Sequence, residues 1–285
     1  MTDTMRNHTG LTTAEIGALP FGKVVRTTTY KVKYIPGMMP AVQGKSSFQI
    51  KVVNLSDGMP TTGLTLKLMP MMHMATMKHA APVDVVTESA TPGTYNCTVY
   101  YLMASGPGVG FWELKVMIGN GMMGMGTGEA ATFYPAVGMP MGPNTVRVTL
   151  KGQNDIISSM TSTEKRTYYL FRDGLATNST TTLDLFIAAK ESMMSYPAVS
   201  VGTVLSSPTG TVTSMTVEAS SDGGANWITA TDNTKGHWSI PGLSGLVSGA
   251  TSTIFVKLNV NGEAKTTDGN ALSGTNDYAT FIVTP

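Results

Sequence analysis

The sequence predicts an all-β protein built from antiparallel sheets, and three observations support this fold class. Apolar and polar residues alternate along many short segments, which is the pattern of a strand with one buried face. The chain has 31 glycines among 285 residues and is rich in threonine and serine, a composition typical of strands and turns. Hydrophobic residues make up 41% of the chain, which suffices for a packed core.

The first half of the chain contains about seven predicted strands. In the segment 47–53, for example, Phe48, Ile50 and Val52 form one apolar face. The other predicted strands cover residues 24–35, 64–69, 83–87, 95–101, 111–118 and 130–134. This number of short antiparallel strands before residue 140 predicts an immunoglobulin-like β-sandwich.

The segment Thr91–Cys97 resembles a tyrosine corner, in which a tyrosine two positions before a cysteine opens a late strand. Cys97 is the single cysteine of the chain. An intramolecular disulfide and a cysteine-based zinc or iron–sulfur site are therefore excluded. We interpret Cys97 as a small core residue rather than a reactive thiol.

A proline- and glycine-rich segment, residues 138–144, predicts a linker between two domains. We expect a flexible N-terminal segment at 1–23, a first β-sandwich at 24–137 and a second β-sandwich at 145–285. Strands of the second are predicted at 145–151, 165–171, 181–188, 211–218, 225–230, 236–240, 252–260 and 278–284. Asp57-Gly58 and Asp173-Gly174 are each predicted to form a turn between strands. This repeated pattern favours two tandem sandwiches of similar topology. The alternative is that two unrelated hairpins converged on the same turn residues.

Composition excludes two classes of partner. A formal net charge of +1, with only 13% charged residues, argues against nucleic-acid binding, which needs a basic face. No apolar run approaches the roughly 18 residues that a membrane span requires.

The first eight residues contain no apolar signal-peptide core. Two readings remain, a cytosolic protein or an exported one whose signal peptide has been removed. Because the composition is typical of exported bacterial β proteins, we expect the second, in the periplasm or outside the cell.

Methionine is concentrated in the first half of the chain. Of the 21 methionines, 17 lie in residues 1–141, and the segment 69–79 carries five of them with two histidines. This segment follows a predicted strand directly, so it lies on a loop or strand end, where binding residues concentrate. The candidate metal ligands are Met71, Met72, His73, Met74, Met77 and His79. Possible additional ligands are Met38, Met39, Met122, Met123 and Met125.

Thioether sulfur is a soft, neutral donor that selects Cu(I) or Ag(I), and imidazole suits both Cu(I) and Cu(II). Pro70 and Pro82 bracket the segment and restrict its freedom, which lowers the entropic cost of closing around an ion. The alternative is that these methionines fill the core or form an adaptable protein-binding surface. We interpret His8 and His237 as structural or incidental.

Motifs of the common enzyme classes are missing. The sequence has no G-x-S-x-G and no H-E-x-x-H, and four histidines with few acids supply acid–base catalysis poorly. Residues 106–110 predict a hairpin loop rather than a phosphate cradle. Ser220–Trp227 matches the Asp-box spacing S-x-D-x-G-x-x-W of sialidase-like propellers, and we expect Asp222 and Trp227 to have a structural role in one hairpin. We therefore predict a protein that is not an enzyme.

Several motifs follow one another in a family-like order. They are the strand Phe48–Val53, the turn Asp57–Pro60, the strand Leu64–Leu68, the loop Met69–Met74, and the segments Pro92–Tyr95 and Gly110–Val116. In this order, residues 46–134 resemble a YtkA-like domain, a family related to FixH-like proteins. The resemblance implies an immunoglobulin-like fold in an exported bacterial protein associated with copper handling. It also implies copper binding by Met71, Met72, His73, Met74, Met77 and His79, which match the family's variable Met/His loop.

Our leading hypothesis is an exported copper-binding protein that holds Cu(I), with Cu(II) or Ag(I) as alternatives, for storage, delivery or resistance. Its partner would be a copper donor or acceptor protein. The rival hypothesis is a structural or adhesive protein of the cell surface or extracellular space. Its methionine-rich pole would be a protein-binding patch, and its edge strands would allow self-association. A third hypothesis is a subunit docked on a redox enzyme.

Overall fold

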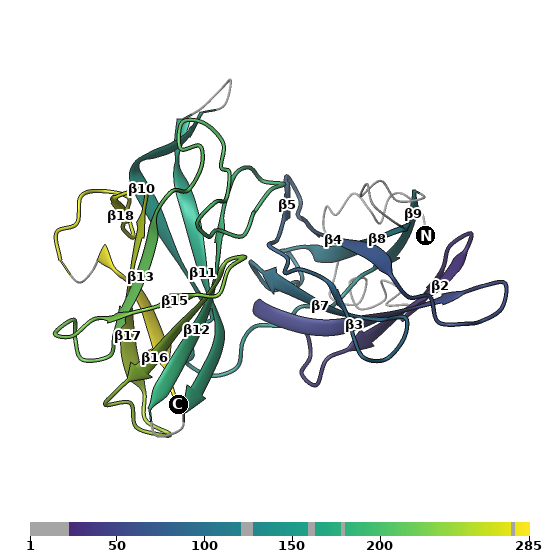
Figure 1. Cartoon of the computed structure of the whole chain (residues 1–285), viewed down its shortest axis with the longest axis horizontal. Coiled ribbons are helices and arrows are strands. Elements are labelled where there is room, and N and C mark those ends of the chain that lie inside the picture. The colour runs from purple at the N-terminus through teal and green to yellow at the C-terminus, as the bar shows by residue number, and fades with distance from the viewer. Residues whose placement is uncertain (1–22, 121–127, 159–162, 178–179, 275–276) are drawn as a thin grey trace. The chain divides into compact units, whose positions relative to one another are not determined.

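The computed structural model in Figure 1 describes residues 23–120, 128–158, 163–177, 180–274 and 277–285. The chain forms two compact units, residues 1–139 and 140–285, and their boundary lies within the segment 138–144. The described chain is all β, and every pairing between its named strands is antiparallel. Within those ranges, no helix has the length and hydropathy needed to cross a membrane. The predicted flexible segment 1–23, apart from Lys23, lies outside the described residues.

The first unit contains two antiparallel sheets, with strand orders β1-β2-β3-β7-β6 and β5-β4-β8-β9. The strands are β1 (Val24–Arg26), β2 (Tyr30–Pro36), β3 (Gly44–Asn54), β4 (Leu64–His73), β5 (Lys78–Ala80), β6 (Thr87–Glu88), β7 (Thr94–Tyr101), β8 (Phe111–Asn120) and β9 (Glu129–Phe133). The predicted strand 24–35 is split into β1 and β2, because the chain turns where the Thr27 amide donates to the Tyr30 carbonyl.

The core of the first unit lies between its two sheets. The alternating apolar residues predicted for β3, such as Phe48 and Ile50, are buried, as are those of β8. Aromatic rings join the sheets, since the ring centroids of Tyr34 and Phe133 lie 5.7 Å apart and those of Tyr101 and Trp112 lie 4.8 Å apart. The unit is therefore β-sandwich-like, with an aromatic-rich interior.

Tyr95 has a different role from the predicted tyrosine corner, which would bond to backbone only a few residues upstream. Its hydroxyl donates to the Thr61 carbonyl at 2.9 Å and accepts the Leu64 amide at 3.1 Å. Thr61 lies in the connection that leads into β4 and Leu64 is the first residue of β4, so Tyr95 ties β7 to the opposite sheet. Cys97 is buried, and its burial raises the pKa of the thiol to about 12, which agrees with its interpretation as a core residue.

The second unit also contains two antiparallel sheets, with orders β10-β11-β12-β16-β15 and β14-β13-β17-β18, and β19 pairs with β17. Its strands are β10 (Arg147–Ser158), β11 (Thr163–Thr177), β12 (Thr181–Ala189), β13 (Met215–Ser220), β14 (Ile228–Thr229), β15 (Thr231–Asp232), β16 (His237–Leu243), β17 (Ser252–Val260), β18 (Glu263–Lys265) and β19 (Ala279–Val283). Buried residues from both sheets, among them Leu170, Ile187, Val217 and Val256, form one core cluster.

Two turn predictions for the second unit have different outcomes. Asp173-Gly174 was expected to form a turn like that at Asp57-Gly58, and this prediction is wrong because the pair lies inside β11. There it makes a bulge against β12 between Arg172 and Gly174. The predicted structural role of the Asp-box motif is confirmed, since the Asp222 carboxylate accepts hydrogen bonds from the Asn226 amide and the Ser220 hydroxyl. This turn is followed by Trp227, whose ring N–H donates to the Gly224 carbonyl.

Candidate functional sites

The predicted Met/His loop is mostly a β-hairpin. β4 continues through the methionines as far as His73, because it pairs with β8 from Leu64 opposite Asn120 to His73 opposite Phe111. A short turn follows, closed by a hydrogen bond from the Met74 amide to the Met77 carbonyl, and β5 then returns along β4. The candidate ligands therefore lie at one end of a rigid sheet.

This hairpin separates the candidate ligands onto two faces of the sheet. Residues directly opposite one another on paired strands share a face, and successive residues alternate between faces. Met72 lies opposite both His79 and Trp112, so these three residues point into the core. Met71 and His73 occupy the other face. Four of the six predicted ligands thus form two separate pairs, Met72 with His79 and Met71 with His73, rather than one group.

The inner cluster consists of His79, Met103, Met72 and Trp112. The imidazole of His79 is only 6% exposed, and its Nδ1 lies 2.8 Å from the Ala80 carbonyl oxygen. A carbonyl can only accept, so Nδ1 carries the proton and donates. The other ring nitrogen, Nε2, lies 3.3 Å from the Sδ atom of Met103. An imidazole nitrogen and a thioether sulfur therefore face each other at contact distance.

Trp112 organises this cluster from β8. Its ring is fully buried and packs edge-on against the His79 ring, with 5.4 Å between their centroids. Its Nε1–H donates to the Met103 carbonyl at 2.9 Å, which fixes the backbone next to the sulfur. His79 and Trp112 lie on the two strands that flank β4, and both are paired with the buried Met72.

Met103 was not among the ligands predicted from the sequence, although its position just after a predicted strand could have indicated it. It lies two residues after the end of β7 and remains partly exposed, at the end of the unit where the β4–β5 hairpin lies. Gly110 lets the chain enter β8 beside this cluster. Its φ is +139°, and a Cβ built there would lie 2.1 Å from the His73 carbonyl oxygen and 3.2 Å from Met72 Cε.

The outer cluster is more polar. His73 is buried, its Nε2 lies 3.1 Å from Glu113 Oε2, and its ring stacks on Phe111 with 5.1 Å between centroids. Met71 lies directly opposite Glu113 on the same face. This group offers a carboxylate, an imidazole and a thioether, which is a harder donor set than the inner cluster.

The remaining candidate methionines do not join either cluster by any described contact. Met74 is partly exposed and Met77 is exposed, at the tip of the hairpin. Met38 and Met39 are exposed in the connection between β2 and β3. Met122, Met123 and Met125 lie outside the described residues. The described ranges contain no group of three or more His, Cys, Asp or Glu that could hold a metal ion.

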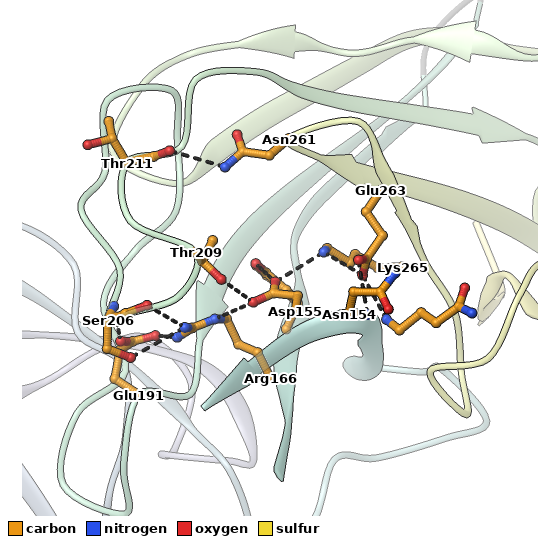
Figure 2. Close-up of polar contacts among 12 residues, drawn as sticks. Asn154, Asp155, Arg166, Glu191, Ser206, Thr209, Thr211, Asn261, Glu263 and Lys265 are labelled. Carbon is orange, nitrogen blue, oxygen red and sulfur yellow. Dashed lines mark hydrogen bonds and ion pairs between the residues drawn. The ribbon is translucent and has the colours of Figure 1, made fainter. Parts of the chain in front are cut away.

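The second unit contains a buried ionic network that sequence reasoning missed (Figure 2). Asp155 lies at its centre. Its Oδ1 pairs with Arg166 Nε at 2.8 Å, and its Oδ2 pairs with Lys265 Nζ at 3.0 Å. Arg166 is fully buried and also pairs with Glu191, while Lys265 Nζ lies 3.0 Å from Glu263 Oε1. Two cations thus meet three carboxylates.

A bulge in β10 makes room for this network. The pairing of β10 with β11 is interrupted between Lys151 and Ile156, and this places Asp155 in the bulge. The bulge backbone also holds Glu263, since the amides of Gln153 and Asn154 donate to its two carboxylate oxygens at 2.7 and 3.0 Å. At Gly152, a Cβ would lie 2.3 Å from that of Asp155, so only glycine fits.

Buried charges of this kind require full pairing, because removing one partner leaves an uncompensated charge in a low-dielectric interior. Desolvation acts to raise the pKa of Asp155, but hydrogen bonds from Thr209 and Tyr168, the nearby Lys265 and the hydrogen bond from Arg166 lower it overall. A cavity of about 240 Å³ borders the network and is lined by Asp155, Thr209, Glu263 and Lys265 among others.

No family model matches the sequence, and no curated protein matches it either.

Proposed function

We propose that the first unit binds a soft monovalent metal ion, Cu(I) or Ag(I), at the inner cluster. The observation that carries this proposal is the partly buried contact between His79 Nε2 and Met103 Sδ at 3.3 Å. With metal–nitrogen and metal–sulfur distances of about 2.0 and about 2.3 Å, one ion bound to both atoms would make an N–metal–S angle of about 100°. Such an angle suits a three- or four-coordinate ion.

The orientation of the His79 ring supports the same role. Because Nδ1 donates to the Ala80 carbonyl, Nε2, which lies on the side of the sulfur, is the ring nitrogen left to bind a metal ion in the neutral imidazole. Met72, buried on the same face, supplies a second thioether. All three ligands are then neutral, which favours a monovalent soft ion over a divalent hard one in a buried site. The indole of Trp112 adds an aromatic face that attracts a cation.

Exchange of the ion with a partner would pass through Met103, since this ligand is partly exposed whereas His79 and Met72 are buried. We expect the role to be copper storage, delivery or resistance in the periplasm or outside the cell, with a copper donor or acceptor protein as partner. No catalytic step is part of this proposal, and the YtkA-like resemblance of residues 46–134 points in the same direction.

We also infer that the first unit has the strand order of an immunoglobulin fold. Four strands in the order β2-β3-β7-β6 face four in the order β5-β4-β8-β9. Taken along the chain, these match the A-B-E-D and C-F-G orders of that fold, with β5 as an added edge strand. We expect the second unit to be a sandwich of the same class.

The experiment compares thioether variants on the two faces of the sheet. Met103→Leu and Met72→Leu conserve side-chain volume and cost less than about 1.5 kcal/mol of stability. Each removes one sulfur ligand, and we expect Cu(I) affinity to fall by at least about tenfold. Met71→Leu on the outer face and Met77→Leu at the hairpin tip are matched controls that should leave the affinity unchanged.

Two outcomes would redirect the proposal. If Met71→Leu lowers the affinity and Met103→Leu does not, the ion binds at the outer cluster with His73 and Glu113. If the unmodified protein takes up no Cu(I) and associates with itself, the structural or adhesive alternative is favoured. Edge strands β5 and β9 of the first unit would then be the places to search for the contact.

A further inference from the structure

We propose that Lys265 and Asp155 of the second unit form an intramolecular amide bond without an enzyme or cofactor, because the buried network places an amine, a carboxyl group and a proton-transferring carboxylate in contact. The proposal concerns the other unit of the chain and is independent of metal binding. It would make the second unit a covalently locked β-domain.

The two reacting groups come from different segments of the chain that pair with each other. Lys265 ends β18 and Asp155 lies in the β10 bulge, while a bridge between Lys151 and Thr266 joins the same two segments. Lys265 Nζ lies 3.0 Å from Asp155 Oδ2, and the two residues are only 3% and 6% exposed. Such fixed proximity gives an intramolecular reaction a high effective concentration.

The reaction requires a neutral amine and a protonated carboxyl oxygen. A proton passes from Lys265 Nζ to Asp155 Oδ2 across their contact, which converts the ion pair into a neutral pair. Burial favours this conversion, because a low-dielectric interior penalises charged forms. The donors around Asp155 oppose it by lowering its pKa, so the neutral pair is a minor state. The bond therefore forms slowly, but it needs to form only once in each molecule.

The network supplies the other groups that the reaction needs. When Nζ attacks Cγ, negative charge develops on Oδ1, which already accepts hydrogen bonds from Arg166 Nε and the Thr209 hydroxyl. Tyr168 donates its hydroxyl to Oδ2, the oxygen that leaves. Glu263 Oε1 lies 3.0 Å from Nζ and can take its second proton.

The atoms and charges balance within these residues. The Cγ–Nζ bond forms, the Cγ–Oδ2 bond breaks, and Oδ2 leaves as water with two protons from Nζ, one transferred directly and one through Glu263. Glu263 ends as the carboxylate that it was at the start, and the charges of Lys265 and Asp155 disappear together. The adjoining cavity of about 240 Å³ gives the water a way out.

The test is the intact mass of the full chain, measured after purification and again after several days at physiological temperature. We expect a mass lower than that of the sequence by one water molecule. We also expect a protease digest to contain one branched peptide that joins the β10 bulge to β18. The proposal is overturned if the aged protein keeps the full sequence mass, or if the digest places the lost water at another residue, such as an Asp-Gly succinimide.

Variants assign the roles. Lys265→Arg keeps the charge but removes the nucleophile, and it should keep the full sequence mass. Glu263→Gln should slow the loss of water at least about tenfold, because it removes the proton acceptor. Lys190→Arg is the matched control: Lys190 pairs with Glu164 at 3.0 Å on the surface, and this variant should lose water as the unmodified protein does. Loss of water that persists in Lys265→Arg would also contradict the proposal.

Discussion

The hydroxyl of Tyr95 is expected to stabilise the first unit, because it forms two hydrogen bonds with the backbone at and just before the start of β4. It donates to the Thr61 carbonyl and accepts the Leu64 amide, and the Tyr95 side chain is only 1% exposed. Replacing it in Tyr95→Phe removes both bonds and leaves a backbone donor and acceptor without their partner. A loss of this kind costs about 1–3 kcal/mol of the free energy of unfolding.

Tyr101, on the same strand, provides the matched control. Its hydroxyl is fully buried and has no hydrogen-bond partner among the described residues, and burial raises the pKa of the phenol well above its usual value. Removing an unsatisfied buried hydroxyl relieves a desolvation cost. We therefore expect Tyr101→Phe to leave the free energy of unfolding unchanged or to increase it.

The assay is amide hydrogen exchange of the β3 and β8 backbone, which reports the free energy of opening of the first unit separately from the second. Equal protection in Tyr95→Phe and in the unmodified protein would refute the reasoning. Equal destabilisation by Tyr95→Phe and Tyr101→Phe would refute it as well, because the effect would then come from the lost oxygen alone and not from its bonds.

Three further predictions concern the first unit. Gly110→Ala should destabilise it by about 1–3 kcal/mol in thermal unfolding, since the new methyl group would meet a backbone oxygen of β4, whereas Gly106→Ala, which has open space around it and no positive φ, should cost much less. Desolvation acts to raise the pKa of Glu129, but hydrogen bonds from two threonines between β1 and β2 lower it overall. The ionised Glu129 should therefore stabilise the fold above the ordinary glutamate pKa, and this stabilisation should be lost as the pH falls through the lowered pKa of the folded protein. In Glu129→Gln, the free energy of unfolding should depend less on pH in that range. The Cys97 thiol should resist alkylation at pH 8 in the folded protein and react readily in urea, as mass spectrometry would show.

Strands with one clean apolar face could be predicted from the sequence, and the Met/His segment could not. In β3 and β8, large apolar residues alternate with polar ones, so the periodicity of two is visible without a structure. In β4 the alternation continues through Met71, Met72 and His73, but methionine and histidine occupy both faces there. The pattern therefore disappears where the strand continues, and a loop was predicted in its place.

The rest of both sites depends on contacts between distant segments. Met103 and His79 meet because β5 and the end of β7 lie at the same end of the unit, which single-sequence periodicity does not specify. Asp155, Arg166 and Lys265 are ordinary charged residues in separate strands, and only the β10 bulge brings them together. The sequence could indicate the soft-ligand chemistry of the first unit, but not its geometry or the network of the second.

The most direct test of the central claim is a titration of the metal-free full chain with Cu(I) in the presence of a competing chelator, with Ag(I) and Zn(II) in parallel. The inner cluster predicts one tightly bound equivalent of Cu(I) or Ag(I), no competitive binding of Zn(II), and a shift of the His79 ring resonances on binding. Failure to take Cu(I) from the chelator, or Zn(II) binding as tight as that of Cu(I), would contradict a neutral thioether–imidazole site in this protein.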